Sequence, residues 1–217
     1  VLLEMERNGI RVALERLRKD VEMYKAWQVK VDEWVIKALK TSSEINLNSG
    51  EQLMDAMINA GKVDTDVAPR TPTGKFQTNK DALLVAVSDK TLLSMLKYRA
   101  GLKTCVGTFM GSWLAMAELS GGYIYTSWNQ TKSAEGAGAI GTRTGRLSAT
   151  WFMNMPKEFD SLWKHENPKK PACPIKGLPP LPQVRSYIIP YKDDHVLIDR
   201  DFCFGPDTDV LTNRGFV

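Results

Sequence analysis

The chain has 217 residues, 43% of them hydrophobic, which is enough for one sizeable core or two small ones. Its formal net charge of +4 suits a polyanionic partner but also many metabolic enzymes, so charge alone selects no function class. The three cysteines lie far apart without a CxxC pair, which disfavours a zinc site or a disulfide framework and indicates a reducing cytoplasm. No apolar run approaches the roughly 18 residues that span a bilayer, so no membrane partner is expected.

The first half of the sequence predicts helices. Apolar residues recur with the helical period over residues 14–38, and at about 1.5 Å per residue this helix is about 40 Å long, enough to protrude as an arm. Ser49 and Gln52 have capping-box spacing and predict a helix that Gly61 closes. Two more helix starts follow, at residues 78–81 and 88–91, the second leading into one helical pattern as far as Leu114.

After residue 120 the hydrophobic period changes, and the sequence predicts strands and loops. Residues 123–128 are rich in aromatic and β-branched side chains and predict a strand. The proline-rich residues 167–182 predict an irregular surface insertion without helix or strand. Residues 187–190 and 195–199 predict two buried strands around a turn. Helices followed by strands predict an α+β fold.

Three parts of the sequence occur in the order and rough spacing found in one enzyme family. They are residues 4–12 followed by 123–131, the run Thr-Arg-Thr-Gly-Arg-Leu-Ser at 142–148 followed by Asn-Met-Pro at 154–156, and Val-Leu-Ile-Asp-Arg-Asp-Phe at 196–202. This ordered set resembles the family A, or DNA polymerase I-like, DNA polymerases, and covers nearly all of residues 1–202. The chain departs from the family pattern at Ala13, Trp151 and Met153, and its insertion over residues 160–183 is longer.

The resemblance implies a helical thumb over residues 1–120 and a first palm segment over 121–202, part of an antiparallel sheet with a proline-rich insertion at about 160–183. It implies template-directed DNA synthesis, with primer-template DNA and deoxynucleoside triphosphates as partners of the complete enzyme. The fingers and the rest of the palm are missing, so we expect no polymerisation by the chain alone. A start without Met, within a helical pattern, predicts a fragment. The expected location is the cytoplasm of a bacterial cell or a phage-infected host.

Candidate DNA-binding residues follow from the same resemblance. In the family, the Arg of the Thr-Gly-Arg-Leu-Ser run, here Arg146, reaches the minor groove, where every correct base pair offers acceptors and an Arg can test pair geometry without reading sequence. Thr144 and Asn154 belong to the same motif and are implied to contact DNA. Positive residues on the last predicted thumb helix could contact phosphates: Lys97, Arg99 and Lys103. The alternatives are a loop-closing surface Arg and an ordinary solvated helix face.

Asp201 is the candidate catalytic residue, because phosphoryl transfer needs Mg²⁺ held between protein oxygens and the incoming triphosphate. A two-metal site needs a further carboxylate, which in the family lies later in the palm, beyond this sequence. Asp199 lies two residues away and shares a strand face with Asp201, but the family register assigns the metal ligand to Asp201. The alternative interpretation of Asp201 is a turn or cap residue.

The polymerase resemblance ends at Cys203, and residues 203–217 resemble the N-terminal block of an intein. That block has a first Cys, then Asp-Thr-x-Val-Leu-Thr and a Gly turn, and inteins favour insertion within active-site motifs. The resemblance implies that Cys203 is the splicing nucleophile and that a complementary polymerase and intein fragment is a partner. A divergent tail or a frameshifted end is the alternative.

Two rival functions remain open from sequence. The chain could be a non-catalytic helical DNA-binding module that kept only the thumb, or a splicing precursor whose immediate role is association with an intein partner. The ordered motifs and the strand that carries Asp201 favour the polymerase over the binding module. A downstream gene for the remaining intein, followed by Ser-Gln, would favour the splicing precursor.

Overall fold

The long helix predicted from residue 14 forms, and it is the longest helix among the described residues. The computed structural model describes residues 2–42, 44–129, 148–149, 152, 155–157, 159–190, 211–212 and 215–216. Its helical elements are α1 (Leu2–Asn8), α2 (Leu14–Leu39), α3 (Gly50–Asn59), α4 (Lys80–Ala86), α5 (Lys90–Lys103), the π-helix η1 (Thr104–Met110), α6 (Gly111–Leu119) and the 3-10 helix η2 (Val184–Tyr187). None of the helices in the described part of the chain is both long enough and apolar enough to cross a membrane.

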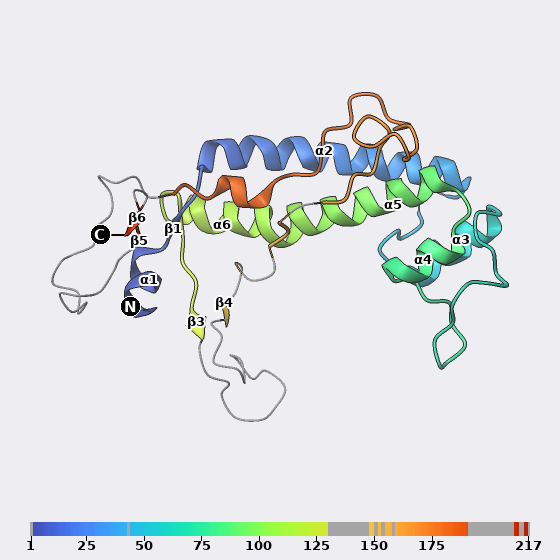
Figure 1. Cartoon of the computed structure of the whole chain (residues 1–217), viewed down its shortest axis with the longest axis horizontal. Coiled ribbons are helices and arrows are strands. Elements are labelled where there is room, and N and C mark those ends of the chain that lie inside the picture. Colours follow the sequence, from blue (N-terminus) through green and yellow to red (C-terminus); the bar gives the residue numbers. More distant parts are fainter. Residues whose placement is uncertain are drawn as a thin grey trace.

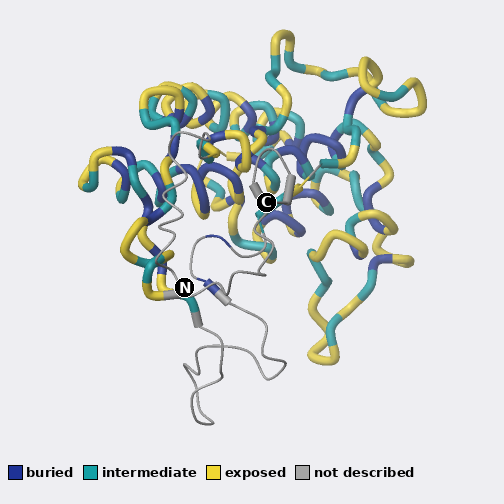
Figure 2. Tube along the Cα trace, turned by 60° about the vertical axis from the view of Figure 1, so that its left-hand side comes forward, coloured by how far each residue is buried: buried dark blue, intermediate teal, exposed yellow. Residues whose placement is uncertain are grey.

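Helix α2 is one arm of a helical hairpin, and α5, η1 and α6 together form the other arm, which runs back alongside it (Figure 1). The face of α2 toward the second arm has apolar side chains at helical spacing, all buried: Leu17, Val21, Tyr24, Val31, Val35 and Leu39. The helix ends at Lys40, where a positive φ of 51° lets the backbone N–H bond back to Ile36 and Lys37. The helix predicted over residues 14–38 is therefore confirmed, and Figure 2 shows the buried residues where the two arms meet.

The predicted helix starts are also confirmed, with one change in the capping box. Ser49 Oγ accepts from the Gln52 N–H at 3.4 Å, as predicted. Gln52 does not complete the box, because its Oε1 accepts from the Asn46 N–H at 2.8 Å instead of from Ser49. Asn79 and Asp89 cap α4 and α5 through their side-chain oxygens.

The helical pattern predicted from residue 88 to Leu114 forms, but it contains a π-helical stretch that the periodicity does not predict. Over Thr104–Met110 the backbone bonds shift by one residue, and the Gly111 N–H bonds to the Val106 carbonyl. A Cβ at residue 111 would lie 2.9 Å from that carbonyl oxygen, so glycine permits the close approach. Such bulges insert one extra residue into a helix and rotate the side chains that follow.

The described strands are short and pair as antiparallel two-stranded sheets, which together with the helices is consistent with an α+β fold. The strands are β1 (Ile10–Arg11) with β2 (Tyr123–Ile124), β3 (Trp128–Asn129) with β4 (Ser148–Ala149), and β5 (Leu211–Thr212) with β6 (Gly215–Phe216). The single strand predicted over residues 123–128 is wrong in its continuity. It breaks after Ile124 and resumes with β3 at Trp128, whose N–H donates to Glu6 Oε1 at 2.6 Å.

Residues 159–189, which we call the strap, return along the helical hairpin. The prediction that residues 167–182 contain no helix or strand is confirmed, but this segment is not only a surface loop. The nearby Trp163 is 3% exposed in the core. The hydroxyl of Tyr98 donates to Pro179 O at 2.8 Å, and that of Tyr24 donates to Pro180 O at 3.0 Å. Proline carbonyls in an extended segment have no intra-segment partner, so they are free to accept these bonds.

The end of the strap corrects another predicted strand. Residues 187–190 were expected to be a buried strand, but Val184–Tyr187 form η2, and only a single antiparallel bridge pairs Ile188 with Val12. Tyr187 is 2% exposed, and its hydroxyl donates to Asp20 Oδ2 at 2.7 Å. Burial, followed by this bond to the carboxylate, raises the pKa of Tyr187, so it remains a donor at neutral pH. The second predicted strand, residues 195–199, lies outside the described residues.

Candidate nucleic-acid interface

Helix α5 carries the three predicted phosphate-binding residues, which lie on two different sides of the helix. Asp89 fixes the start of α5 by accepting from the N–H groups of Thr91 and Leu92. Arg99 and Lys103, four residues apart, lie on one side. Lys97 lies on another and lines a different groove. The three residues therefore do not form one charged row.

Arg99 is engaged inside the helical hairpin. Its Nε and Nη2 donate to the two carboxylate oxygens of Asp32 on α2, at 2.6 and 3.3 Å. Nη1 donates to Leu47 O and Nη2 also donates to Asn48 Oδ1, both at 3.1 Å. The Arg99 side chain is 14% exposed. A bidentate pair of this kind positions α5 against α2 and against the loop before α3, and a phosphate contact by Arg99 stays a prediction.

Lys103 is exposed beside that pair and lines a groove of about 490 Å³ between α2, the loop before α3, and α5. On the α2 side the groove has a second exposed lysine, Lys25. Neither lysine forms an ion pair with any described residue. The Arg99 guanidinium in this groove is already paired with Asp32, so the two lysine ammonium groups are the ones that can bind backbone phosphates, without reading sequence. Lys25 was missed in the sequence because its place on the exposed face of α2 is also what an ordinary solvated lysine shows.

Lys97 lies in a second groove, of about 360 Å³, between α4, α5 and the strap. Burial lowers the pKa of Lys97, and the nearby charges of Lys170 and Lys80 lower it further. Lys80 reaches Asp160 of the strap at 3.5 Å, but both side chains are largely exposed. Sequence spacing gives no signal that Lys170 approaches Lys97, because the two residues are far apart along the chain.

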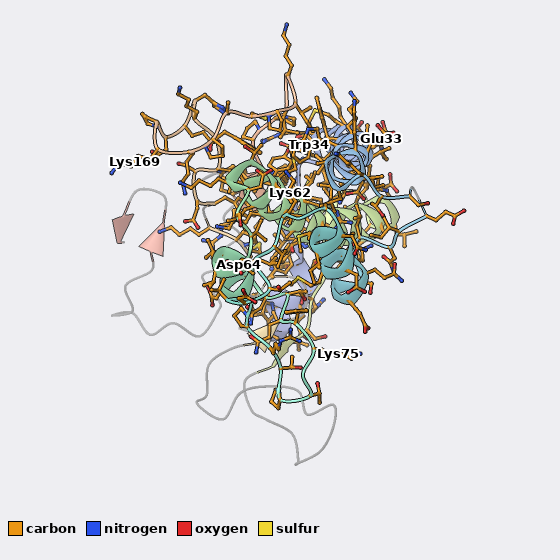
Figure 3. The ribbon with its side chains drawn as sticks, turned by 90° about the vertical axis from the view of Figure 1, so that its right-hand side faces the viewer. Glu33, Trp34, Lys62, Asp64, Lys75 and Lys169 are labelled. Atoms are coloured by element: carbon orange, nitrogen blue, oxygen red, sulfur yellow. The ribbon has the colours of Figure 1, made fainter. Side chains whose placement is uncertain are left out.

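A basic hairpin extends from the loop between α3 and α4. Arg70 and Phe76 form an antiparallel bridge around a turn at Gly74, whose φ is +81°, and the Arg70 guanidinium lies 3.9 Å from the Phe76 ring centroid. Figure 3 shows Lys75 on this projecting segment. Lys75 pairs with Glu51 at 3.1 Å, with both side chains about two-thirds exposed, so the pair is weakly held.

The remaining predicted site residues lie outside the described residues: Thr144, Arg146, Asn154, Asp201 and Cys203. Their assignments stay predictions from the sequence. Within the described residues, no group of three or more His, Cys, Asp or Glu side chains could hold a metal ion. The metal assignment therefore rests on Asp201 and on the resemblance that points to it.

Comparison with known proteins shows similarity at the level of the fold. No protein-family model and no curated protein matches the chain. Among solved structures, the chain is similar to the POL domain of Pol1 from M. smegmatis in complex with DNA primer-template and dNTP, with a TM-score of 0.56 and 24% sequence identity. The match covers 71% of this chain and 25% of that chain, so this chain corresponds to about a quarter of the length of that protein.

Proposed function

We propose that the chain is the thumb and first palm segment of a family A DNA polymerase, which binds primer-template DNA and supplies one metal-binding carboxylate. The observation that carries the proposal is the fold shared with the Pol1 POL domain, which was solved with DNA primer-template and dNTP. The motifs at 142–148 and 196–202 support it independently, since they stand in the order of the same family. Catalysis is proposed to need the fingers and the remaining palm of the complete enzyme as well.

The thumb contribution is phosphate binding by the groove between α2 and α5. Lys103 and Lys25 are the proposed phosphate contacts, and Arg99 holds the two helices at the spacing that the groove requires. Arg146, Thr144 and Asn154 are proposed to contact the minor groove at the primer end. Contacts of these kinds position a duplex and test base-pair geometry, and so predict binding without sequence preference.

Reversal of the charge of Lys103 tests whether the groove between α2 and α5 binds DNA phosphates. Lys103→Glu should weaken primer-template binding about tenfold and reduce the slope of log affinity against log salt by about 1, because one phosphate contact is lost. Fluorescence anisotropy at several salt concentrations measures both quantities. Lys37→Glu is the matched control, since Lys37 is exposed on α2 outside the groove. Equal effects of the two substitutions would show that the groove has no specific part in DNA binding.

The proposed chemistry of the palm segment is metal binding by Asp201. Mg²⁺ held by Asp201 and by a later palm carboxylate would neutralise charge on the transferring phosphoryl group. The carboxylate of Asp201 supplies a hard oxygen ligand, which is the type that Mg²⁺ prefers. Deoxynucleoside triphosphates are the proposed substrates of the complete enzyme.

A second proposed function is protein splicing, favoured by the intein-like sequence that starts at Cys203. Within the described residues, strands β5 and β6 pair Leu211 with Phe216 and place Thr212 opposite the motif's glycine, Gly215, which supports an antiparallel pairing within the motif. Cys203 is proposed to attack the preceding carbonyl carbon and convert the Phe202–Cys203 peptide bond to a thioester, with release of the Cys203 amine. The chain should stay inert until a complementary intein fragment binds.

Mass spectrometry of a mixture with a complementary C-terminal intein segment followed by Ser-Gln tests the splicing proposal. Residues from 203 onward should be excised, and Phe202 should be joined to Ser-Gln, because each intein half supplies part of the reaction centre. Cys203→Ala should give no ligated product. Ligated product in equal amount from the Cys203→Ala chain, or none from the unaltered chain with an active partner, would contradict the proposal.

A further inference from the structure

The groove between α4, α5 and the strap, here named the α4–α5 groove, has features that DNA binding by the thumb does not use. Its volume of about 360 Å³ is within the range of small binding pockets. The floor is mainly aliphatic, formed by Leu83 and Leu93 with Leu96, and by Leu162 and Leu181 of the strap. An aliphatic surface of this kind is suited to an apolar side chain and offers nothing to a phosphate.

The strap is held close enough to α5 to make the groove a fixed feature. A Cβ at Gly101 would lie 2.9 Å from Leu181 Cδ1 and 3.5 Å from Phe159 Cε1, so the absence of a side chain lets the strap approach the helix. Trp163, 3% exposed, anchors the same segment in the core. A preformed groove loses little conformational entropy when it is filled, which favours binding.

The rim of the groove concentrates positive charge. Lys80 and Lys97 line it, and Lys170 of the strap lies near enough to help lower the pKa of Lys97. Among the described residues that line the groove, the one carboxylate is Asp160, which meets Lys80 at 3.5 Å with side chains 81% and 66% exposed. An exposed pair of this kind is weak, so the rim keeps a net positive charge that an anionic ligand would neutralise.

We propose that the α4–α5 groove docks a short acidic segment of a partner protein, with one leucine or phenylalanine side chain on the aliphatic floor and carboxylates on the lysine rim. Charge complementarity and the apolar floor together favour a peptide over a nucleic-acid strand. Strands without sequence preference bind by stacking bases on aromatic side chains, and Phe159 is the single aromatic residue among the described residues that line this groove. An apolar anchor with charged flanks is a recurring form of peptide recognition.

Three fluorescent probes test this proposal on the whole chain: a short acidic peptide with one phenylalanine, the same peptide with that phenylalanine replaced by serine, and single-stranded oligo-dT. The acidic apolar peptide should bind, and the serine peptide should bind about 30-fold more weakly because it lacks the anchor. Equal binding of both peptides, no peptide binding, or an oligo-dT affinity that falls with Lys97→Glu while the peptide affinity does not, would overturn the proposal.

Substitutions in the chain test the lysine rim and the aliphatic floor of the groove one at a time. Lys97→Glu should weaken binding of the apolar peptide about tenfold or more through the rim, and Ala100→Trp should weaken it by filling the groove from an exposed helix position. Lys176→Glu is the matched control on the strap, because Lys176 is exposed and outside the groove. Circular dichroism checks that each variant folds. Primer-template affinity is measured separately, so failure of peptide docking and failure of thumb binding are distinguishable.

Discussion

Asp201→Ala should lower deoxynucleotide incorporation by the complete polymerase about a thousandfold or more, while leaving primer-template binding nearly unchanged. The substitution removes a carboxylate that is proposed to hold Mg²⁺, and metal stabilisation of transferring phosphoryl groups supplies several kcal/mol to the barrier. Primer-template binding is proposed to depend on the groove between α2 and α5, so it should persist. A single-turnover incorporation assay with saturating DNA measures the chemical step directly.

Asp199→Ala is the control for that prediction, because Asp199 is the neighbouring carboxylate on the same predicted strand face. It should retain most of the incorporation rate. If Asp199→Ala is inactive and Asp201→Ala keeps a nearly normal rate, then the metal ligand is Asp199 and the assignment to Asp201 is wrong by two residues. If both are nearly normal, this segment does not hold the catalytic metal.

Trp113→Ala should lower the free energy of unfolding by about 3–5 kcal/mol, the largest stability effect that we expect from one substitution in the hairpin. Trp113 is 0% exposed in α6, where its ring stacks on Phe152 at 5.2 Å between centroids and meets the edge of Phe109 at 6.2 Å. Removal of the Trp113 ring leaves a cavity where α6 packs against Phe152, which follows β4. Urea unfolding followed by circular dichroism measures the loss.

Trp34→Ala is the matched control, since Trp34 lies on the other arm and is only partly buried (Figure 3). Its removal should cost less than about 1.5 kcal/mol, because the surrounding solvent can fill the space. A similar loss for both tryptophans would mean that the aromatic cluster around Trp113 is not the main core of the hairpin.

Local sequence signals predict the helical part of the fold well. The helix at 14–38 has a long periodic stripe, and Ser49, Asn79 and Asp89 are caps whose side chains act within a few residues. The π-helix is not predictable in this way, because a shift of the backbone bonds by one residue leaves the apolar composition of the helix unchanged. The main sequence feature that accompanies it is Gly111. The packing of the strap depends on bonds such as Tyr98 to Pro179, which join residues distant in sequence.

For the candidate site, the sequence predicted basic residues but not their arrangement in space. These residues were predicted along the last thumb helix, but the side of the helix that each one occupies decides its surroundings. Arg99 pairs with Asp32, which the helical hairpin brings near, and Lys97 lines the α4–α5 groove with Lys80. Lys103 keeps an exposed ammonium group beside the groove between α2 and α5. Tertiary contacts of this kind are invisible to spacing along one helix.

The affinity of the unaltered chain for two primer-templates of unrelated sequence, measured over a range of salt concentrations, tests the central proposal most directly. A thumb that contacts phosphates should bind both DNAs equally, and log affinity should fall linearly with log salt. Fluorescence anisotropy on a sample shown to be folded gives both results. Absence of binding at low salt, or a clear preference for one sequence, would contradict the proposal that this chain is a polymerase thumb.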